Sequence, residues 1–205
     1  MSIFIEGLLS GLLLACSLGP IFIALTQTSL EKGIKPGMTV GSGIWFSDIL
    51  IVFLMYKFLH KIQSTIESPS FNFWMGLSGG IILIIFGAAL LIKKPKLEYE
   101  NITIKKSDYF AFWLKGFLVN TVNPFTFIFW MGIISTYMIG RKVTDTQIMI
   151  LLTTIIVVII LSDIFKVLLA HGLKKFLTPS HINTIANLSG IILIIFGLFL
   201  GYKTY

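Results

Sequence analysis

Two aspartates stand within long apolar runs, Asp48 in the run 37–58 and Asp163 in the run 147–170. A carboxylate near the centre of a bilayer costs roughly 2.5–3.5 kcal/mol on insertion scales, so one kept there has a function or a partner. Because a buried carboxyl group can take up and release a proton, both are candidates for proton coupling, and Asp48 is also a candidate substrate contact. For Asp163 a second interpretation stands beside this one, since Lys166 follows at i+3 and would neutralise it.

Two further candidates are the pairs Gly19-Pro20 and Asn123-Pro124, which interrupt the apolar runs 3–28 and 109–137. Proline has no amide hydrogen and clashes with the carbonyl four residues earlier, so each pair frees backbone groups inside its run. Such groups are tolerated in a bilayer only where they face protein or a watery cavity, and the helix that starts at each proline presents amides suited to a carboxylate. All four residues are therefore candidate substrate contacts; the alternative is a kink that serves only packing.

Gly43 and Asn120 complete the set of candidate substrate contacts. Gly43 would let a neighbouring backbone approach the break at Gly19-Pro20, although close packing between helices also explains a glycine there. Asn120 would hydrogen-bond either the carbonyls freed near Asn123 or the substrate itself. Other side chains that could line a cavity are Gln27, Trp45, Thr126 and Trp130.

The composition indicates that these groups lie in a membrane. Of 205 residues, 56% are apolar and only 12% are charged, about half the usual share of charges. Uncharged runs such as 71–92 are long enough to cross a bilayer, and they lack the alternation typical of membrane β-strands. We therefore expect an all-α integral membrane protein. The net charge of +7 comes from lysines clustered between apolar runs, which argues against a nucleic-acid partner. Because Cys16 is the single cysteine, intrachain disulfides are excluded.

An internal repeat organises the chain. The octamer Gly80–Gly87 returns unchanged as Gly190–Gly197, and other landmarks recur around it in the same order. Three spans are expected in each half, so that the six transmembrane helices cover residues 3–28, 37–58, 71–92, 109–137, 147–170 and 184–201. An odd number of spans inverts the second copy relative to the first, a plan that places the substrate site of many secondary transporters near the midplane. The expected units are the repeats 1–92 and 109–205, joined by a basic cytoplasmic linker, 93–108.

The distribution of basic residues predicts the orientation. Eleven of the 16 Lys and Arg residues fall on the side of the turns after spans one, three and five, counting Lys115 and Lys166 as helix-end residues. The other five fall on the opposite side. By the positive-inside rule the first side is cytoplasmic, so both termini are expected outside the cytoplasm.

Motifs in both halves resemble those of a known family. The residues Gly19-Pro20, Glu31-Lys32-Gly33, Pro36-Gly37, Gly41, Gly43 and Asp48 resemble the first-half signature of the LysE/RhtB family of amino-acid exporters, and Gly116, Asn120, Asn123 and Pro124 resemble its second-half signature. The resemblance extends over nearly the whole chain. It implies a six-span exporter in the inner (cell) membrane that moves amino acids or related small zwitterionic solutes outward, driven by an ion gradient and without a cofactor. Two departures are Leu18, where many members carry proline, and Phe125, where many carry lysine.

The leading hypothesis is proton-coupled export by alternating access, with Asp48 carrying the proton or contacting the ammonium group of an amino acid. Sodium is the less favoured coupling ion. One alternative is export of a divalent or heavy-metal cation, whose site would need converging carboxylates, thiols or imidazoles. Another is an intramembrane enzyme or scaffold, although the sequence pairs no nucleophile with a base. Gly-xxx-Gly faces at Gly7/Gly11 and Gly37/Gly41 permit a homodimer but equally serve packing within the bundle.

Overall fold

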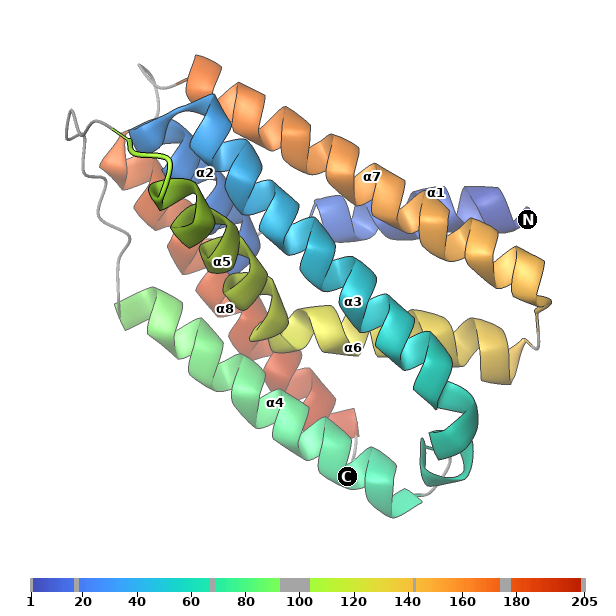
Figure 1. Ribbon diagram of the computed structural model, residues 1–205. Coiled ribbons are helices and arrows are strands. Elements are labelled where there is room, and N and C mark those ends of the chain that lie inside the picture. The colour runs from blue at the N-terminus through green and yellow to red at the C-terminus, as the bar shows by residue number, and fades with distance from the viewer. Residues whose placement is uncertain are drawn as a thin grey trace.

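The computed structural model describes residues 2–16, 19–66, 69–92, 104–141, 143–173 and 178–203. Every regular element in these ranges is a helix, which confirms the all-α fold class (Figure 1). The helices are α1 (Ile3–Ala15), α2 (Pro20–Lys32), α3 (Ile34–Ile66), α4 (Pro69–Ile92), α5 (Asp108–Thr121), α6 (Pro124–Ile134), the π-helix η1 (Ser135–Gly140), α7 (Asp145–Gly172) and α8 (Pro179–Lys203).

The helices are those of a multi-pass membrane protein. Three are long and apolar enough to cross a bilayer, at Ile34–Phe58, Asp145–Gly172 and Ser180–Tyr202. Two bent pairs, α1 with α2 and α5 with α6 and η1, pass the same test together, which gives up to five spans among the residues that the structure describes. Within α4, Gly76–Ile92 is a shorter apolar helix.

Both predicted helix breaks are present. α2 begins at Pro20 and α6 at Pro124, and the helix axis bends by 66° at the first break and by 60° at the second. Proline suits the first position of a helix because its missing amide hydrogen would have no partner there and its φ is already helical. The caps differ: the Asn123 side chain accepts a hydrogen bond from the amide of Phe125 over 3.2 Å, whereas Gly19 offers α2 no side-chain cap.

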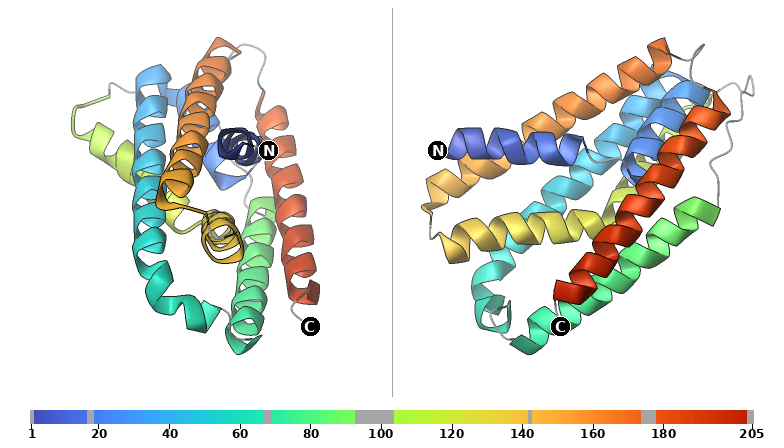
Figure 2. Two further views of the ribbon diagram at one scale, coloured as in Figure 1. Left: turned by 90° about the vertical axis from the view of Figure 1, so that its right-hand side faces the viewer. Right: turned by 180° about the vertical axis from the view of Figure 1, so that it is seen from behind.

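The two copies of the repeated octamer pack against each other. α4 and α8 lie side by side in both orientations of view (Figures 1 and 2). A Cβ on Gly80 would lie 2.7 Å from the carbonyl oxygen of Gly197, and a Cβ on Gly87 would lie 2.5 Å from that of Gly190. Because the first glycine of one copy meets the last of the other, the two helices run antiparallel, and only glycine allows their backbones to come so close.

The Gly-xxx-Gly faces also pack within the chain. A Cβ on Gly7 or Gly11 would meet side chains of α7, among them Val158 at 2.8 Å from the Gly11 position. A Cβ on Gly37 would lie 3.1 Å from Ser29 of α2 and from Val167 of α7. Of the two uses that the sequence allowed for these glycines, the structure therefore shows packing inside the bundle.

Three expectations need comment. α3 stays helical through Ile66, past the expected end of its span at residue 58, because no proline or glycine interrupts the polar residues that follow. Lys166 was counted as a helix-end residue, but its side chain lines a cavity instead. Residues 93–103 of the expected linker, and Leu18, Lys142, Lys174 and Lys175, lie outside the described residues.

The ends of the chain lie on one side of the bundle. Figures 1 and 2 show the start of α1 and the end of α8 on the same side as the end of α3 and the start of α7. The start of α3, the start of α5 and the end of α7 lie on the opposite side. The lysines in the turn between α2 and α3 thus lie far from both termini.

Candidate functional site

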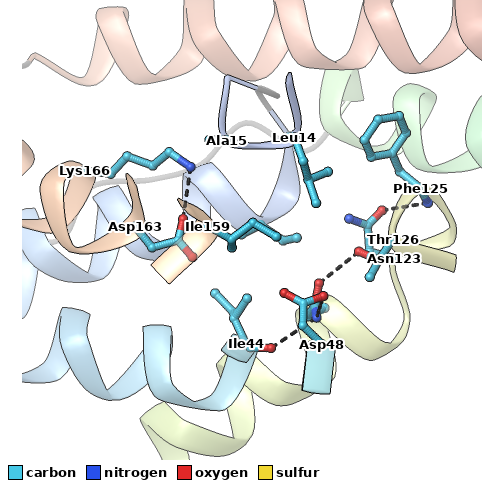
Figure 3. A pocket seen from close by; sticks show the side chains of 13 residues that line it. Leu14, Ala15, Ile44, Asp48, Asn123, Phe125, Thr126, Ile159, Asp163 and Lys166 are labelled. Carbon is cyan, nitrogen blue, oxygen red and sulfur yellow. Dashed lines mark hydrogen bonds and ion pairs between the residues drawn. The ribbon is translucent and has the colours of Figure 1, made fainter. Parts of the chain in front are cut away.

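A small cavity forms where the two helix breaks approach α3 and α7 (Figure 3). Its polar lining residues are Asp48, Asn120, Asn123, Thr126, Asp163 and Lys166. They come from α3, α5, the start of α6 and α7, while Leu14, Ala15, Gly19 and Ile21 add the break between α1 and α2. The cavity has a volume of about 40 Å³. The cavity is therefore small, and polar side chains share its lining with apolar ones.

Asp48 is buried in this cavity with only one carboxylate oxygen occupied. Its residue is 4% exposed, and Oδ1 accepts hydrogen bonds from Nδ2 of Asn120 at 3.0 Å and from Nε1 of Trp130 at 2.9 Å. Oδ2 has no hydrogen-bond partner among the described residues. Two donors thus fix the carboxyl group of Asp48 and leave its second oxygen available to a ligand or a proton.

Asn120 connects three helices around Asp48. Besides its bond to Asp48, its Nδ2 donates to the carbonyl oxygen of Ile44 at 3.2 Å, while its Oδ1 accepts from the hydroxyl of Thr126 at 2.9 Å. The carbonyl that Asn120 bonds belongs to α3 and is not one of those freed near Asn123, and its role as a substrate contact stays a prediction. The side chain is completely buried, so these bonds hold α3, α5 and α6 together at the cavity.

Asp163 differs from Asp48 because both of its oxygens are occupied. Oδ1 accepts from Nζ of Lys166 at 3.0 Å, and Oδ2 accepts from Nε1 of Trp45 at 3.0 Å. The ion pair between Asp163 and Lys166 that the i+3 spacing suggested is thus present. Lys166 lines the cavity, and Figure 3 shows its ammonium group above the Asp163 carboxylate.

The structure brings together five of the predicted site residues and separates three. Gly19, Asp48, Asn120, Asn123 and Asp163 line the one cavity. Pro20 begins α2 but does not line the cavity, and Pro124 faces a second, mostly apolar groove between α4 and α6. Gly43 packs against α5, where a Cβ would overlap the carbonyl oxygen of Trp113, so its position serves the contact between α3 and α5.

Sequence reasoning missed seven lining residues as members of the site: the charged Lys166 and the apolar Leu14, Ala15, Ile21, Ile44, Phe125 and Ile159. An ionisable residue inside a span was the signal for Lys166, because such residues seldom face lipid. Of the other suggested liners, Thr126 lines the cavity, Trp45 and Trp130 bond to the two carboxylates behind it, and Gln27 bonds to Glu31.

A polar cluster joins the two bent pairs on the side of the chain ends. Tyr137 of η1 donates to a carboxylate oxygen of the buried Glu6 of α1 at 2.6 Å, and Arg141 forms an ion pair with the same oxygen. The Arg141 guanidinium lies 5.0 Å from the centroid of the Tyr137 ring. Hydrogen bonding to Glu6 raises the pKa of Arg141, so this group stays charged. The cluster therefore ties α1 to η1.

A second polar contact joins the bent pairs on the opposite side. Lys115 of α5 donates to the hydroxyl of Thr28 of α2 at 3.0 Å. Each contact links a helix of the first bent pair to a helix of the second: α1 to η1 on one side, and α2 to α5 on the other.

Within the described ranges, no three His, Cys, Asp or Glu side chains come close enough to hold a metal ion. The ligand set that the metal-export hypothesis requires is thus not assembled by those residues.

Comparison with known proteins identifies relatives over nearly the whole chain. The family model described as LysE type translocator matches residues 12–204. A Bacillus subtilis (strain 168) protein named "Putative amino acid efflux protein YcgF" is 22% identical over 205 residues, which cover 99% of this chain and 97% of that protein. No solved structure matches the chain.

Proposed function

Since the chain belongs to the LysE type translocator family, a family of transporters, we propose that it exports amino acids across the cell membrane in exchange for protons. The name of the Bacillus subtilis relative supports amino acids as the cargo. The observation that carries the proposal is the buried carboxylate of Asp48, which keeps one oxygen open to the cavity between the two helix breaks.

The proposed architecture has six spans arranged as two inverted repeats, 1–92 and 109–205, with 93–108 as the linker. Each bent pair counts as one span, and α4 is the sixth. Three close helix pairs support this arrangement, because each joins one half of the chain to the other: α1 with α7, α3 with α5, and α4 with α8. The antiparallel contact of the repeated octamers is what a two-fold relation between inverted halves requires.

We propose that the two polar contacts act as closures and that the protein works by alternating access. Separation of the cluster of Glu6, Tyr137 and Arg141 opens the cavity to the side of the chain ends. Separation of Lys115 from Thr28 opens it to the opposite side. In this proposal the state with both contacts in place is the occluded step of the cycle. Binding and release then require one closure to separate while the other holds.

Asp48 is the proposed coupling residue. Its open oxygen accepts either a proton or the ammonium group of the substrate, so the two compete for one position and must alternate. Asp163 has no such oxygen, and its contribution to coupling is to hold Lys166. Gly19, Pro20, Asn123 and Pro124 shape the breaks, which give the substrate access to backbone amides inside the membrane.

The proposed orientation places both termini outside the cytoplasm, with the lysine-rich turns inside. A homodimer would need another surface than the Gly-xxx-Gly faces, which are used inside the bundle.

The experiment that tests export uses the purified protein in proteoliposomes. Vesicles are loaded with a panel of radiolabelled amino acids, and efflux is followed with and without an opposing proton gradient. We expect efflux of at least one amino acid, faster than from protein-free vesicles and accelerated by protons supplied on the receiving side. Equal rates with and without protein would contradict the proposal. Acceleration by sodium but not by protons would change the coupling ion.

A further inference from the structure

We propose that Lys166, held in place by Asp163, binds the α-carboxylate of the substrate, and that the cavity selects neutral amino acids with apolar side chains. This inference rests on the export function proposed above and names its substrate class. It also assigns different roles to the two buried aspartates.

The first step is the unequal use of the two carboxylates. One oxygen of Asp163 accepts a hydrogen bond from Lys166 and the other accepts one from Trp45, and the residue is 1% exposed. Each oxygen of Asp163 therefore already accepts a bond from the protein, and the negative charge is paired with Lys166. Asp48 keeps Oδ2 open, so the ammonium group of a substrate has one obvious acceptor in this cavity.

The second step is the remaining capacity of Lys166. An ammonium group has three donors, and among the described residues only Asp163 accepts from it. The side chain is 14% exposed and lines the cavity, so its other donors point to the space that a substrate would occupy. Gly19 and Ile21, at the uncapped start of α2, line the same cavity and bring a helix N-terminus toward the same anion.

The third step is the nature of the remaining wall. Its apolar lining residues are Leu14, Ile21, Ile44, Phe125 and Ile159. Once the ammonium group lies at Asp48 and the carboxylate at Lys166, no further charged side chain of the lining is free. A lysine or glutamate side chain would then be buried without a partner, which is costly, whereas a leucine side chain matches the wall.

The test measures leucine transport into proteoliposomes that contain leucine, for the wild-type chain and for the double variant Lys166→Met/Asp163→Asn. The double variant removes both charges of the pair, so it leaves no unpaired charge in the membrane. Because charge-assisted hydrogen bonds of this kind are worth roughly 10- to 100-fold in affinity, we expect the KM for leucine to rise by about that factor in the double variant. Leucinamide, which lacks the carboxylate, should compete with leucine at least 10-fold more weakly than leucine itself in the wild type, and equally with leucine in the double variant.

The outcomes separate this inference from the proposed function. If the double variant keeps the wild-type KM, or if leucinamide competes as well as leucine in the wild type, Lys166 only neutralises Asp163 and the inference is overturned. If lysine or glutamate is transported as well as leucine, the apolar selectivity is overturned while export stands. If the folded wild-type protein moves no amino acid at all, the export function itself fails. The leucinamide measurement on the wild type needs no variant, so it decides the matter even if the double variant does not fold.

Discussion

The contact between α4 and α8 depends on glycine, and a single methyl group tests it. A Cβ on Gly197 would lie 2.6 Å from the carbonyl oxygen of Gly80. At Gly201, one turn further along α8, a Cβ would meet nothing within 4 Å. Gly197→Ala and Gly201→Ala therefore add the same group to the same helix, one into the contact and one into open space.

The expected effect follows from that distance. Ordinary van der Waals contact begins at 3.4 Å, so the two helices must separate locally by several tenths of an ångström, and neighbouring contacts weaken over the same turn. Overpacking of this kind costs about 1–3 kcal/mol, while alanine gains up to about 1 kcal/mol over glycine in helix propensity. We expect Gly197→Ala to lower the free energy of unfolding by about 1–2 kcal/mol and Gly201→Ala to leave it unchanged or raise it.

The assay is reversible unfolding of the purified protein in mixed micelles, followed by circular dichroism as the denaturing detergent is increased. Gly80→Ala should match Gly197→Ala, since each glycine faces the carbonyl of the other. The double variant should lose less than the sum of the two, because the first methyl group already separates the helices. Equal stability of Gly197→Ala and Gly201→Ala would refute the close antiparallel contact of the repeated octamers.

Three other predictions concern the cavity and its closures. Glu6→Gln should favour opening on the side of the chain ends, so that an impermeant thiol reagent added from that side labels a cysteine at position 126 faster, in a Thr126→Cys/Cys16→Ser background. Lys115→Met should speed labelling from the other side. Unchanged labelling in both variants would contradict the two closures. Gly19→Ala should fold and unfold like the wild type, because its Cβ meets nothing within 4 Å, whereas Gly19→Leu should fold but block transport by filling the cavity. Gly132→Leu is the matched control, because it also adds a side chain to open space but outside the cavity, and it should transport normally. Asn120→Ala should lower the free energy of unfolding by about 1–3 kcal/mol, because it leaves the buried hydroxyl of Thr126 without its acceptor and removes a donor from Asp48. A stability equal to that of the wild type would show that these hydrogen bonds do not stabilise the fold.

The sequence predicted those features that depend on local chemistry. Proline placed both helix breaks correctly, because a residue without an amide hydrogen cannot continue a helix at that point. The i+3 spacing predicted the ion pair between Asp163 and Lys166, because side chains three residues apart share a helix face. Apolar run length and charge predicted a helical membrane protein, and the motifs predicted its family.

Features that depend on how the helices are rotated against one another could not be predicted from the sequence. The donors to Asp48 come from Asn120 and Trp130, which are 72 and 82 residues away in the chain, and no local pattern links them. Gly43 was weighed as a substrate contact, but its orientation toward α5 depends on which face of α3 meets which neighbour. For the same reason Lys166 could not be assigned to the cavity before the packing of α7 was known.

The central claim is that Asp48 couples a proton to a substrate at the meeting point of two broken helices, and one substitution tests it most directly. Asp48→Asn keeps an oxygen for the bonds from Asn120 and Trp130 but cannot lose and gain a proton. Uphill amino-acid transport driven by a proton gradient is measured in proteoliposomes, with Asp145→Asn, an exposed acid outside the cavity, as the matched control. We expect Asp145→Asn to accumulate substrate like the wild type and Asp48→Asn to accumulate none; full accumulation by Asp48→Asn would contradict the account.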